Sequence, residues 1–223
     1  MPTQLLNDDG TASMATMLMS SHHAFRRDAA CFALALADGS RPAAVLAEEW
    51  ARFRGALHGH HTIEDTAMFP DLRAKHPELG ATLDKLDAHH RAIDPLLERG
   101  DKLFADLGTQ RGAASDLIAT LQGLLKEHLD LEEHAITPHL RAAKEFPLPP
   151  TEDAAAMYAE GFAWSMAGIS DAVLGKMREM LPAALVEKLP AARTTFDERC
   201  RRVWGYAHAG ASTTSDPAAT ART

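Results

Sequence analysis

Apolar side chains recur every three or four residues along most of the chain, the period of a helix that turns one face to a core. Gly and Pro residues interrupt this pattern and divide it into long segments. The pattern predicts four long helices over about residues 11–37, 42–75, 77–108 and 112–144. After the Pro-rich stretch FPLPP (Phe146–Pro150), two more helices are predicted over about residues 152–180 and 183–206.

Four long helices joined by short connections are typical of an up-down-up-down bundle. The sequence therefore predicts an all-α fold, with residues 1–147 forming a four-helix bundle. Residues 148–208 are expected to form a helical extension that packs on the bundle. The small, polar residues of segment 209–223 predict a disordered tail.

Composition agrees with this fold and narrows the range of functions. Aromatic residues make up only 6% of the chain, which favours helices over a β-sandwich. The formal net charge is −8, so a nucleic-acid partner is not expected. No apolar run is long enough to span a membrane, and no secretory signal is visible. Two widely separated cysteines, Cys31 and Cys200, predict no disulfide framework and favour the cytoplasm.

The chain has twelve histidines, and helical phase indicates which of them face the core. Each bundle helix turns an apolar stripe inward. The stripe of every one of the four helices contains one histidine, and two stripes add a glutamate four residues after it. The six predicted inward-facing residues are His22, His60, Glu64, His90, His128 and Glu132.

The other histidines near these positions are predicted to face outward. Shifting the first stripe by one residue to admit His23 would place Arg26 in the core, and the stripe through His61 runs through Arg54 and Asp65. We therefore expect solvent-exposed faces or supporting roles for the neighbouring histidines His23, His58, His61, His89 and His134.

Two buried carboxylates with no core lysine or arginine beside them require another partner. Burying them unpaired costs several kcal/mol each, and buried charges survive by pairing or by coordinating a metal. Six ligands are too many for one tetrahedral zinc, so the pattern predicts a dinuclear site. Imidazole and carboxylate ligands suit iron, manganese, zinc or copper. The Glu-x-x-His motif of ferritin-type di-iron proteins is absent.

The same segments resemble the hemerythrin-like (HHE cation-binding) family over roughly residues 12–144. The resemblance implies a four-helix bundle around a non-haem di-iron centre of the Fe-O-Fe type. Position by position, it implies the same six ligands that helical phase selects. The matching segments are HHAFRRD (His22–Asp28), HHTIEDTAMFP (His60–Pro70), HHRAIDP (His89–Pro95) and HLDLEEHAITP (His128–Pro138).

The chain departs from the oxygen-carrying hemerythrins at two positions. They have a second histidine one turn after the third-helix ligand, where this chain has Asp94. They also place the last carboxylate five residues after its histidine, where this chain has Glu133, whereas Glu132 is better phased for the core. Asp94 is expected to act as a seventh ligand, to orient His90, or to leave a coordination position open.

The resemblance implies a protein that binds or senses oxygen, nitric oxide or peroxide at two non-haem iron ions. Two alternatives stay open at this point: an enzyme for peroxide breakdown or ferrous iron oxidation, and an iron storage or homeostasis protein. Other transition metals also fit this set of ligands. The expected partner is a small diatomic or peroxide molecule, with no nucleic acid or membrane, and the expected oligomeric state is a monomer or a homodimer.

Overall fold

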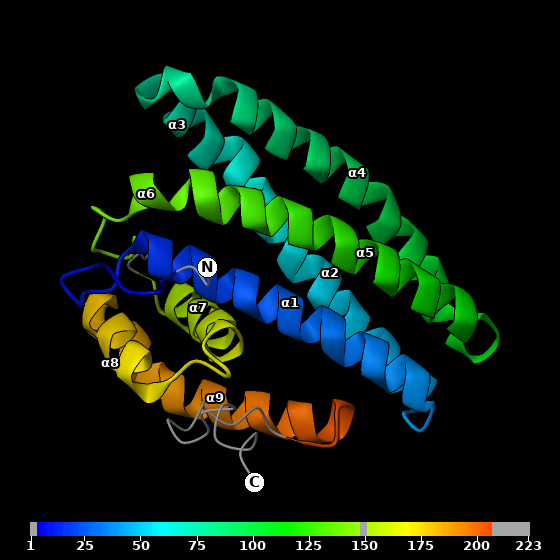
Figure 1. Cartoon of the computed structure of the whole chain (residues 1–223). Coiled ribbons are helices and arrows are strands. Elements are labelled where there is room, and N and C mark those ends of the chain that lie inside the picture. Colours follow the sequence, from blue (N-terminus) through cyan, green and yellow to red (C-terminus); the bar gives the residue numbers. More distant parts are fainter. Residues whose placement is uncertain (1–3, 148–150, 207–223) are drawn as a thin grey trace, which may run out of the picture.

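The computed structural model describes residues 4–147 and 151–206. Within these ranges every regular element is a helix and no strand occurs. The four long bundle helices run alternately up and down, and α5 lies between α1 and α4 (Figure 1). The predicted all-α bundle is therefore confirmed. Its long helices are α1 (Met14–Asp38), α2 (Ala43–Ile63), α4 (Gly80–Ala105) and α5 (Leu107–Ala135).

The second predicted helix, over residues 42–75, is interrupted in the middle. A π-helical turn, η1 (Glu64–Met68), follows α2 and leads into α3 (Phe69–Lys75). The amide of Phe69 donates to the carbonyl of Glu64, five residues earlier. Pro70 has no amide hydrogen, and its ring would clash with the carbonyl four residues before it. One extra residue in the turn relieves that clash and shifts the phase of everything after it.

Other helix boundaries differ modestly from the expected ones. The third predicted helix begins as a short 3-10 turn, η2 (Pro77–Leu79), before α4. Asp106 alone separates α4 from α5, so α5 starts five residues earlier than the predicted residue 112. A short helix, α6 (Thr137–Leu140), completes the bundle.

The chain after the bundle forms three helices instead of the predicted two. They are α7 (Glu152–Ser165), α8 (Asp171–Met180) and α9 (Ala183–Val203). A single helix over residues 152–180 was expected, but Gly168 has a φ of 87°, a left-handed conformation that ends a helix. Helix α7 packs against α1, and α9 packs against α2. Figure 1 shows α7, α8 and α9 together on one side of the bundle.

Two apolar clusters fill the bundle. The larger contains Phe32, Trp50 and Phe104, with the Trp50 and Phe104 rings stacked at 4.6 Å between centroids. Helix α9 contributes Phe196 and Val203 to it, so the extension shares the main core. A second cluster includes Phe69, Leu83, Leu86 and Ile136. The buried histidines and glutamates lie along the helices between these apolar parts.

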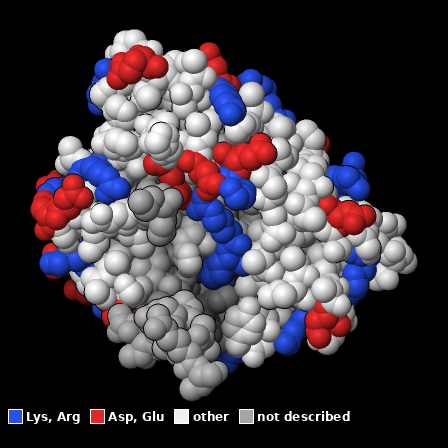
Figure 2. Space-filling view, viewed as in Figure 1, with Lys and Arg blue, Asp and Glu red and all other residues white. Residues whose placement is uncertain are grey.

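The surface and the termini bear on the remaining expectations. On the face shown in Figure 2, the described acidic and basic side chains are interspersed and form no broad patch of one sign. None of the helices in the described ranges is long and apolar enough to cross a membrane. Cys31 and Cys200 are both buried free thiols. The predicted disordered tail, residues 209–223, lies outside the described residues.

Candidate metal centre

Seven buried or nearly buried side chains converge in the middle of the bundle and form two overlapping clusters. Within each cluster the possible ligand atoms all lie within 4.8 Å of one another. Helix α2 and its π-turn supply three of the residues, α5 supplies two, and α1 and α4 supply one each. One cluster consists of His22, His60, Glu64 and Glu132, and the other consists of His61, Glu64, His90 and His128.

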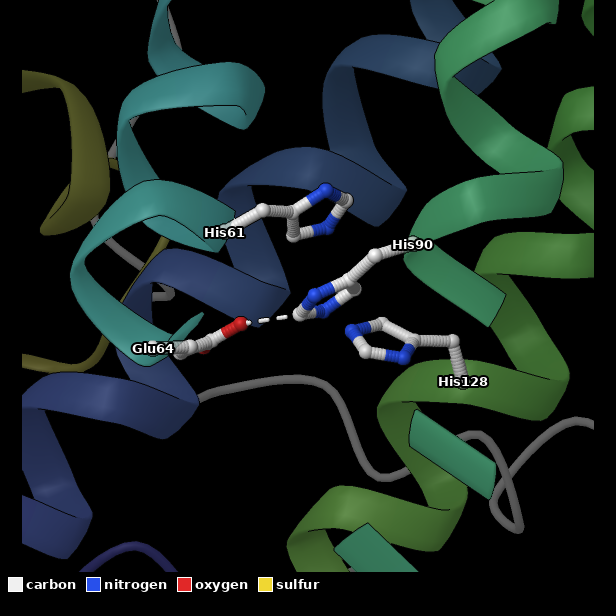
Figure 3. A group of neighbouring side chains, drawn as sticks. All are labelled: His61, Glu64, His90 and His128. Atoms are coloured by element: carbon white, nitrogen blue, oxygen red, sulfur yellow. Dashed lines mark ion pairs between the residues drawn. The ribbon is translucent and has the colours of Figure 1, made fainter. Parts of the chain in front are cut away.

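Glu64 belongs to both clusters, and its two carboxylate oxygens face different histidines. Its Oε1 lies 2.8 Å from His60 Nε2, and its Oε2 lies 3.3 Å from His90 Nε2. Figure 3 shows His61 and Glu64 extending from one helical segment towards His90 and His128, with the ion pair between Glu64 and His90 marked. A carboxylate with one oxygen directed at each cluster has the arrangement needed to bridge two cations.

The polar atoms of this centre lack hydrogen-bond partners among the described residues. Buried polar groups are ordinarily hydrogen-bonded, and each exception requires an explanation. Of the seventeen such side-chain atoms among the described residues, eleven belong to these two clusters, and all eleven are atom types that coordinate metals. They are Nε2 of His22, His60 and His90, both ring nitrogens of His61 and His128, and both carboxylate oxygens of Glu64 and Glu132. The residues therefore fit a dinuclear metal site.

All six residues predicted from helical phase lie in these two clusters, and none is left outside. Their role as metal ligands remains a prediction. His22, His128 and Glu132 are fully buried, while the side chain of His60 is 13% exposed. Among the histidines predicted to face outward, His58 and His134 are exposed. His23 and His89 are half-buried.

The prediction for His61 is wrong. Its exposure is 3%, and its ring stacks on that of His90 at 4.0 Å between centroids. At about 100° per residue, His60, Glu64 and His61 lie at about −60°, −20° and +40° from Leu57 around the helix. All three fall within the arc of about 100° that a helix turns to its core. The prediction allowed only one residue per helical turn to face the core. The buried arc is wide enough for both His60 and His61, and that width could have identified His61 from the sequence.

The π-turn explains a second misplaced residue. In an uninterrupted α-helix the inward stripe would continue from Glu64 to Ala67, but Ala67 is exposed. The extra residue in the turn rotates the following positions, and Phe69 is buried in its place. Phe69 then stacks on the His90 ring at 5.6 Å and closes that side of the centre.

Two carboxylates next to the cluster glutamates hold histidines from neighbouring helices. His90 Nδ1 donates to Asp65 Oδ1 at 2.8 Å, and His22 Nδ1 donates to Glu133 Oε1 at 3.1 Å. When the ring is neutral, as it is when histidine binds a metal, each bond fixes the tautomer and leaves the Nε2 lone pair facing the cluster. The oxygen of Glu133 also accepts from Arg26 at 2.6 Å. Asp94, which was expected to act as a seventh ligand, to orient His90 or to leave a coordination position open, is exposed and belongs to neither cluster.

The comparison with protein families agrees with this geometry. Residues 13–140 match the model described as "Hemerythrin HHE cation binding domain". The chain belongs to this family. The match begins at the N-terminus of α1 and ends with α6, so it covers the whole bundle and all seven cluster residues. No curated protein and no solved structure matches the chain.

Charge is distributed unevenly across the centre of this HHE domain. Burial lowers the pKa of His22, but the negative charge of Glu132 and the hydrogen bond that His22 donates to Glu133 outweigh burial and raise that pKa to about 9. Burial raises the pKa of Glu132, yet the charge of His22 outweighs it and lowers the pKa to about 2. Burial, together with repulsion from Glu132, raises the pKa of Glu64. His22 and Glu132 thus form a buried ion pair in the absence of a cation.

Three of the other cluster histidines, His60, His61 and His128, are held neutral, whereas the hydrogen bonds to Glu64 and Asp65 outweigh burial and raise the pKa of His90. Burial and the charge of His22 lower the pKa of His60 to about 3. Burial likewise lowers the pKa of His128 to about 3, and it also lowers the pKa of His61. Neutral imidazoles are the form in which histidine binds metals. Most of the centre is therefore already in the protonation state that coordination requires.

These shifts predict that the metal-free HHE domain is most stable near pH 6.5. Below that value the unfolded chain binds protons at His60, His61 and His128 that the folded chain does not, and Glu64 offsets one of them. Stability then falls by about 1–3 kcal/mol per pH unit on acidification. Above pH 6.5 the folded chain keeps protons on His22, His90 and Glu64, so stability falls as the pH rises towards 9. Thermal unfolding of chelator-treated protein from pH 5 to 9 measures this maximum, and a midpoint that rises steadily with pH would contradict it.

Replacing Asp65 by alanine is expected to weaken one metal site selectively. Without Asp65 the His90 ring loses its fixed tautomer, and such supporting bonds typically contribute about 10–100-fold in metal affinity. Competition with a chelator of known affinity measures the dissociation constant of each of the two ions separately. Asp94→Ala removes an exposed acid from the helix that carries His90 and should leave both affinities unchanged. Equal weakening in the two variants would show that general negative charge, not the bond to His90, is responsible.

Proposed function

We propose that this HHE domain holds two non-haem iron ions and uses them to bind or sense a small molecule such as oxygen, nitric oxide or peroxide. The observation that carries the proposal is the pair of clusters that share Glu64, with coordinating atoms that are buried and have no hydrogen-bond partner among the described residues. Metal binding follows from the family and the geometry, whereas iron and the small-molecule ligand are the proposed part.

The ligand set supports two ions rather than one. His22, His60 and Glu132 would hold one ion, and His61, His90 and His128 would hold the other. Glu64 would join them, since its two oxygens face different clusters. One site would then have two histidines and two carboxylates, and the other would have three histidines and one carboxylate.

The donor chemistry favours iron. The clusters contain only imidazole and carboxylate groups, without a thiolate, which suits iron or manganese better than softer metals. Bound iron would supply redox chemistry and an affinity for small oxygen and nitrogen ligands. Nothing in the described part of the two clusters provides a competing protein nucleophile, because neither contains a serine or a cysteine.

The residues around the centre position its ligands and exclude water. The Phe25 ring packs against His60 at 5.2 Å, and the Phe69 ring stacks on His90. Asp65 and Glu133 hold the two outer histidines in one tautomer. The chain would thus present two ions in a dry, fixed environment, in which electrostatic interactions are stronger than in water.

Metal analysis and an absorption spectrum of aerobically purified protein test the proposal. We expect about two iron ions per chain, one for each cluster, and the bands of an oxygen-bridged ferric pair. Protein from iron-replete cells that folds normally and contains no transition metal would overturn the proposal. Stoichiometric zinc in place of iron would overturn its redox part alone.

Reaction with small molecules separates binding from the enzymatic alternatives. Reversible spectral changes with oxygen or nitric oxide, without turnover, are expected for a binding or sensing protein. Sustained peroxide breakdown or ferrous iron oxidation would assign the domain to the enzymes. We place the protein in the cytoplasm, which is consistent with two buried free thiols, as a monomer or homodimer.

A further inference from the structure

A cavity of about 390 Å³ lies where the bundle meets the extension. Helix α2 lines it with Phe53 and Ala56, and α7 lines it with Gly161 and Trp164. Arg199 of α9 also reaches its wall. The family match ends before α7 begins, so half of this cavity is formed by residues outside the family domain.

The cavity approaches the least buried ligand of the candidate centre. His60 follows Ala56 by one turn of α2, and its side chain is 13% exposed, whereas the other six cluster residues are almost completely covered. Helical spacing places His60 directly beyond the lining residue Ala56 on the same face. The shortest way along α2 from this cavity therefore leads to His60.

One aromatic ring separates the cavity from the centre. The centroid of the Phe25 ring lies 5.0 Å from that of Trp164 and 6.0 Å from that of Phe53. Both Trp164 and Phe53 line the cavity. The centroid of the Phe25 ring also lies 5.2 Å from that of the His60 ring. Rotation of a single side chain would open a passage between the two.

A second cavity leads to the centre less directly, although both cavities have charged side chains in their walls, which for the first are Asp28, Glu49, Arg52, Glu160 and Arg199. The second cavity is about 380 Å³ and is lined by Arg26 and Glu133. Glu133 accepts from both Arg26 and His22, so a hydrogen-bonded ion pair stands between this cavity and the cluster. Passage there would break charged hydrogen bonds, which contribute more than neutral ones. Moving the Phe25 ring breaks none.

We propose that the cavity between α2, α7 and α9 is the entrance for the small uncharged ligand and that Phe25 is the gate it passes. This inference rests on the proposed function, because it concerns the ligand of the same centre. It also gives the extension a role: α7 contributes Gly161 and Trp164 to the entrance and thereby controls access to His60.

Gly161→Phe is the variant that tests the entrance. A Cβ added at Gly161 meets no other atom within 4 Å, so the first atom of a new side chain fits at the cavity wall without a clash. Gly175→Phe is its matched control, because Gly175 lies in the middle of α8, also has open space around it and does not line this cavity. Both substitutions remove a glycine from a helix interior.

Stopped-flow mixing of the reduced, iron-loaded protein with nitric oxide measures access. We expect Gly161→Phe to lower the association rate about tenfold, as if the open state were about ten times rarer. Gly175→Phe should bind at the original rate, and iron content should be equal in all three proteins. An unchanged rate in Gly161→Phe overturns the entrance and leaves the proposed function intact. Failure of the iron-loaded original chain to bind nitric oxide contradicts the proposed function itself.

Fluorescence quenching of the metal-free chains provides a readout that does not depend on iron. Trp50 and Trp204 are buried, so Trp164 is the indole most open to acrylamide. Filling the cavity in Gly161→Phe should reduce quenching, and Gly175→Phe should not. Slower nitric oxide binding without protection of Trp164 would also overturn the proposal, since the cavity would not be the cause.

Discussion

Replacing Glu64 by glutamine is expected to leave the purified protein with less than half of its metal. Glu64 is the one residue common to both clusters, and it faces His60 with one oxygen and His90 with the other. Glutamine keeps the shape but removes the charge and one acceptor oxygen, so one ion loses a ligand and the other keeps only a neutral carbonyl oxygen in place of a carboxylate. Metal content by mass spectrometry measures the loss. Glu127→Gln, an exposed position next to His128, is the matched control and should keep both ions.

Loss of metal from this variant would not reflect unfolding. Glu64 is a buried carboxylate beside Glu132, and burial with this repulsion raises its pKa in the metal-free chain. The raised pKa keeps Glu64 protonated in the metal-free chain near neutral pH, and glutamine has the same shape and the same neutral charge. Chelator-treated Glu64→Gln should therefore unfold at the same temperature as the chelated original, or higher. A folded variant with two tightly bound ions would refute the shared-carboxylate arrangement.

His61→Ala is expected to lose about one of the two ions. His61 belongs to a single cluster, with Glu64, His90 and His128, while His22, His60 and Glu132 complete the other cluster without it. Helical phase alone predicted the opposite result, retention of metal, because it placed His61 outside. The iron-to-chain ratio distinguishes the two expectations.

His58 provides the matched control for this experiment. It lies on the same helix and is exposed, so His58→Ala should retain both ions. If the metal of His58→Ala and His61→Ala were the same as that of the original chain, the second cluster would not need His61. The buried stack of His61 on His90 would then be a packing contact.

Helical periodicity was sufficient to predict the bundle and six of the seven cluster residues, because both depend on which face each helix buries. It failed where a residue lies off the centre of that face, as His61 does, or beyond a change of helix type, as Ala67 does. The supporting roles of Asp65 and Glu133 depend on how α1, α2, α4 and α5 sit against one another. A single helix contains no information about that arrangement.

The extension shows the same limit. Its helices were predicted from periodicity, but the break near Gly168 and the packing of α7 on α1 were not. The Trp164 ring reaches Phe25 across that contact, and its Nε1 donates to Asp28 at 2.7 Å. These partners are 136 or more positions apart in sequence, so only the folded chain brings them together.

Two pairs of consecutive acids, Glu64–Asp65 and Glu132–Glu133, connect neighbouring helices in the same way. In each pair the first acid faces the Nε2 atom of a histidine on a neighbouring helix, and the second acid accepts from the Nδ1 atom of the same ring. A helix that slid by one turn, about 5.4 Å, would separate both contacts at once. The bundle is therefore locked in register at two places. A single-residue insertion should be tolerated in the loops. The same insertion between one of these acid pairs and the nearest helix end would rotate the acids away from their histidine and should not be tolerated.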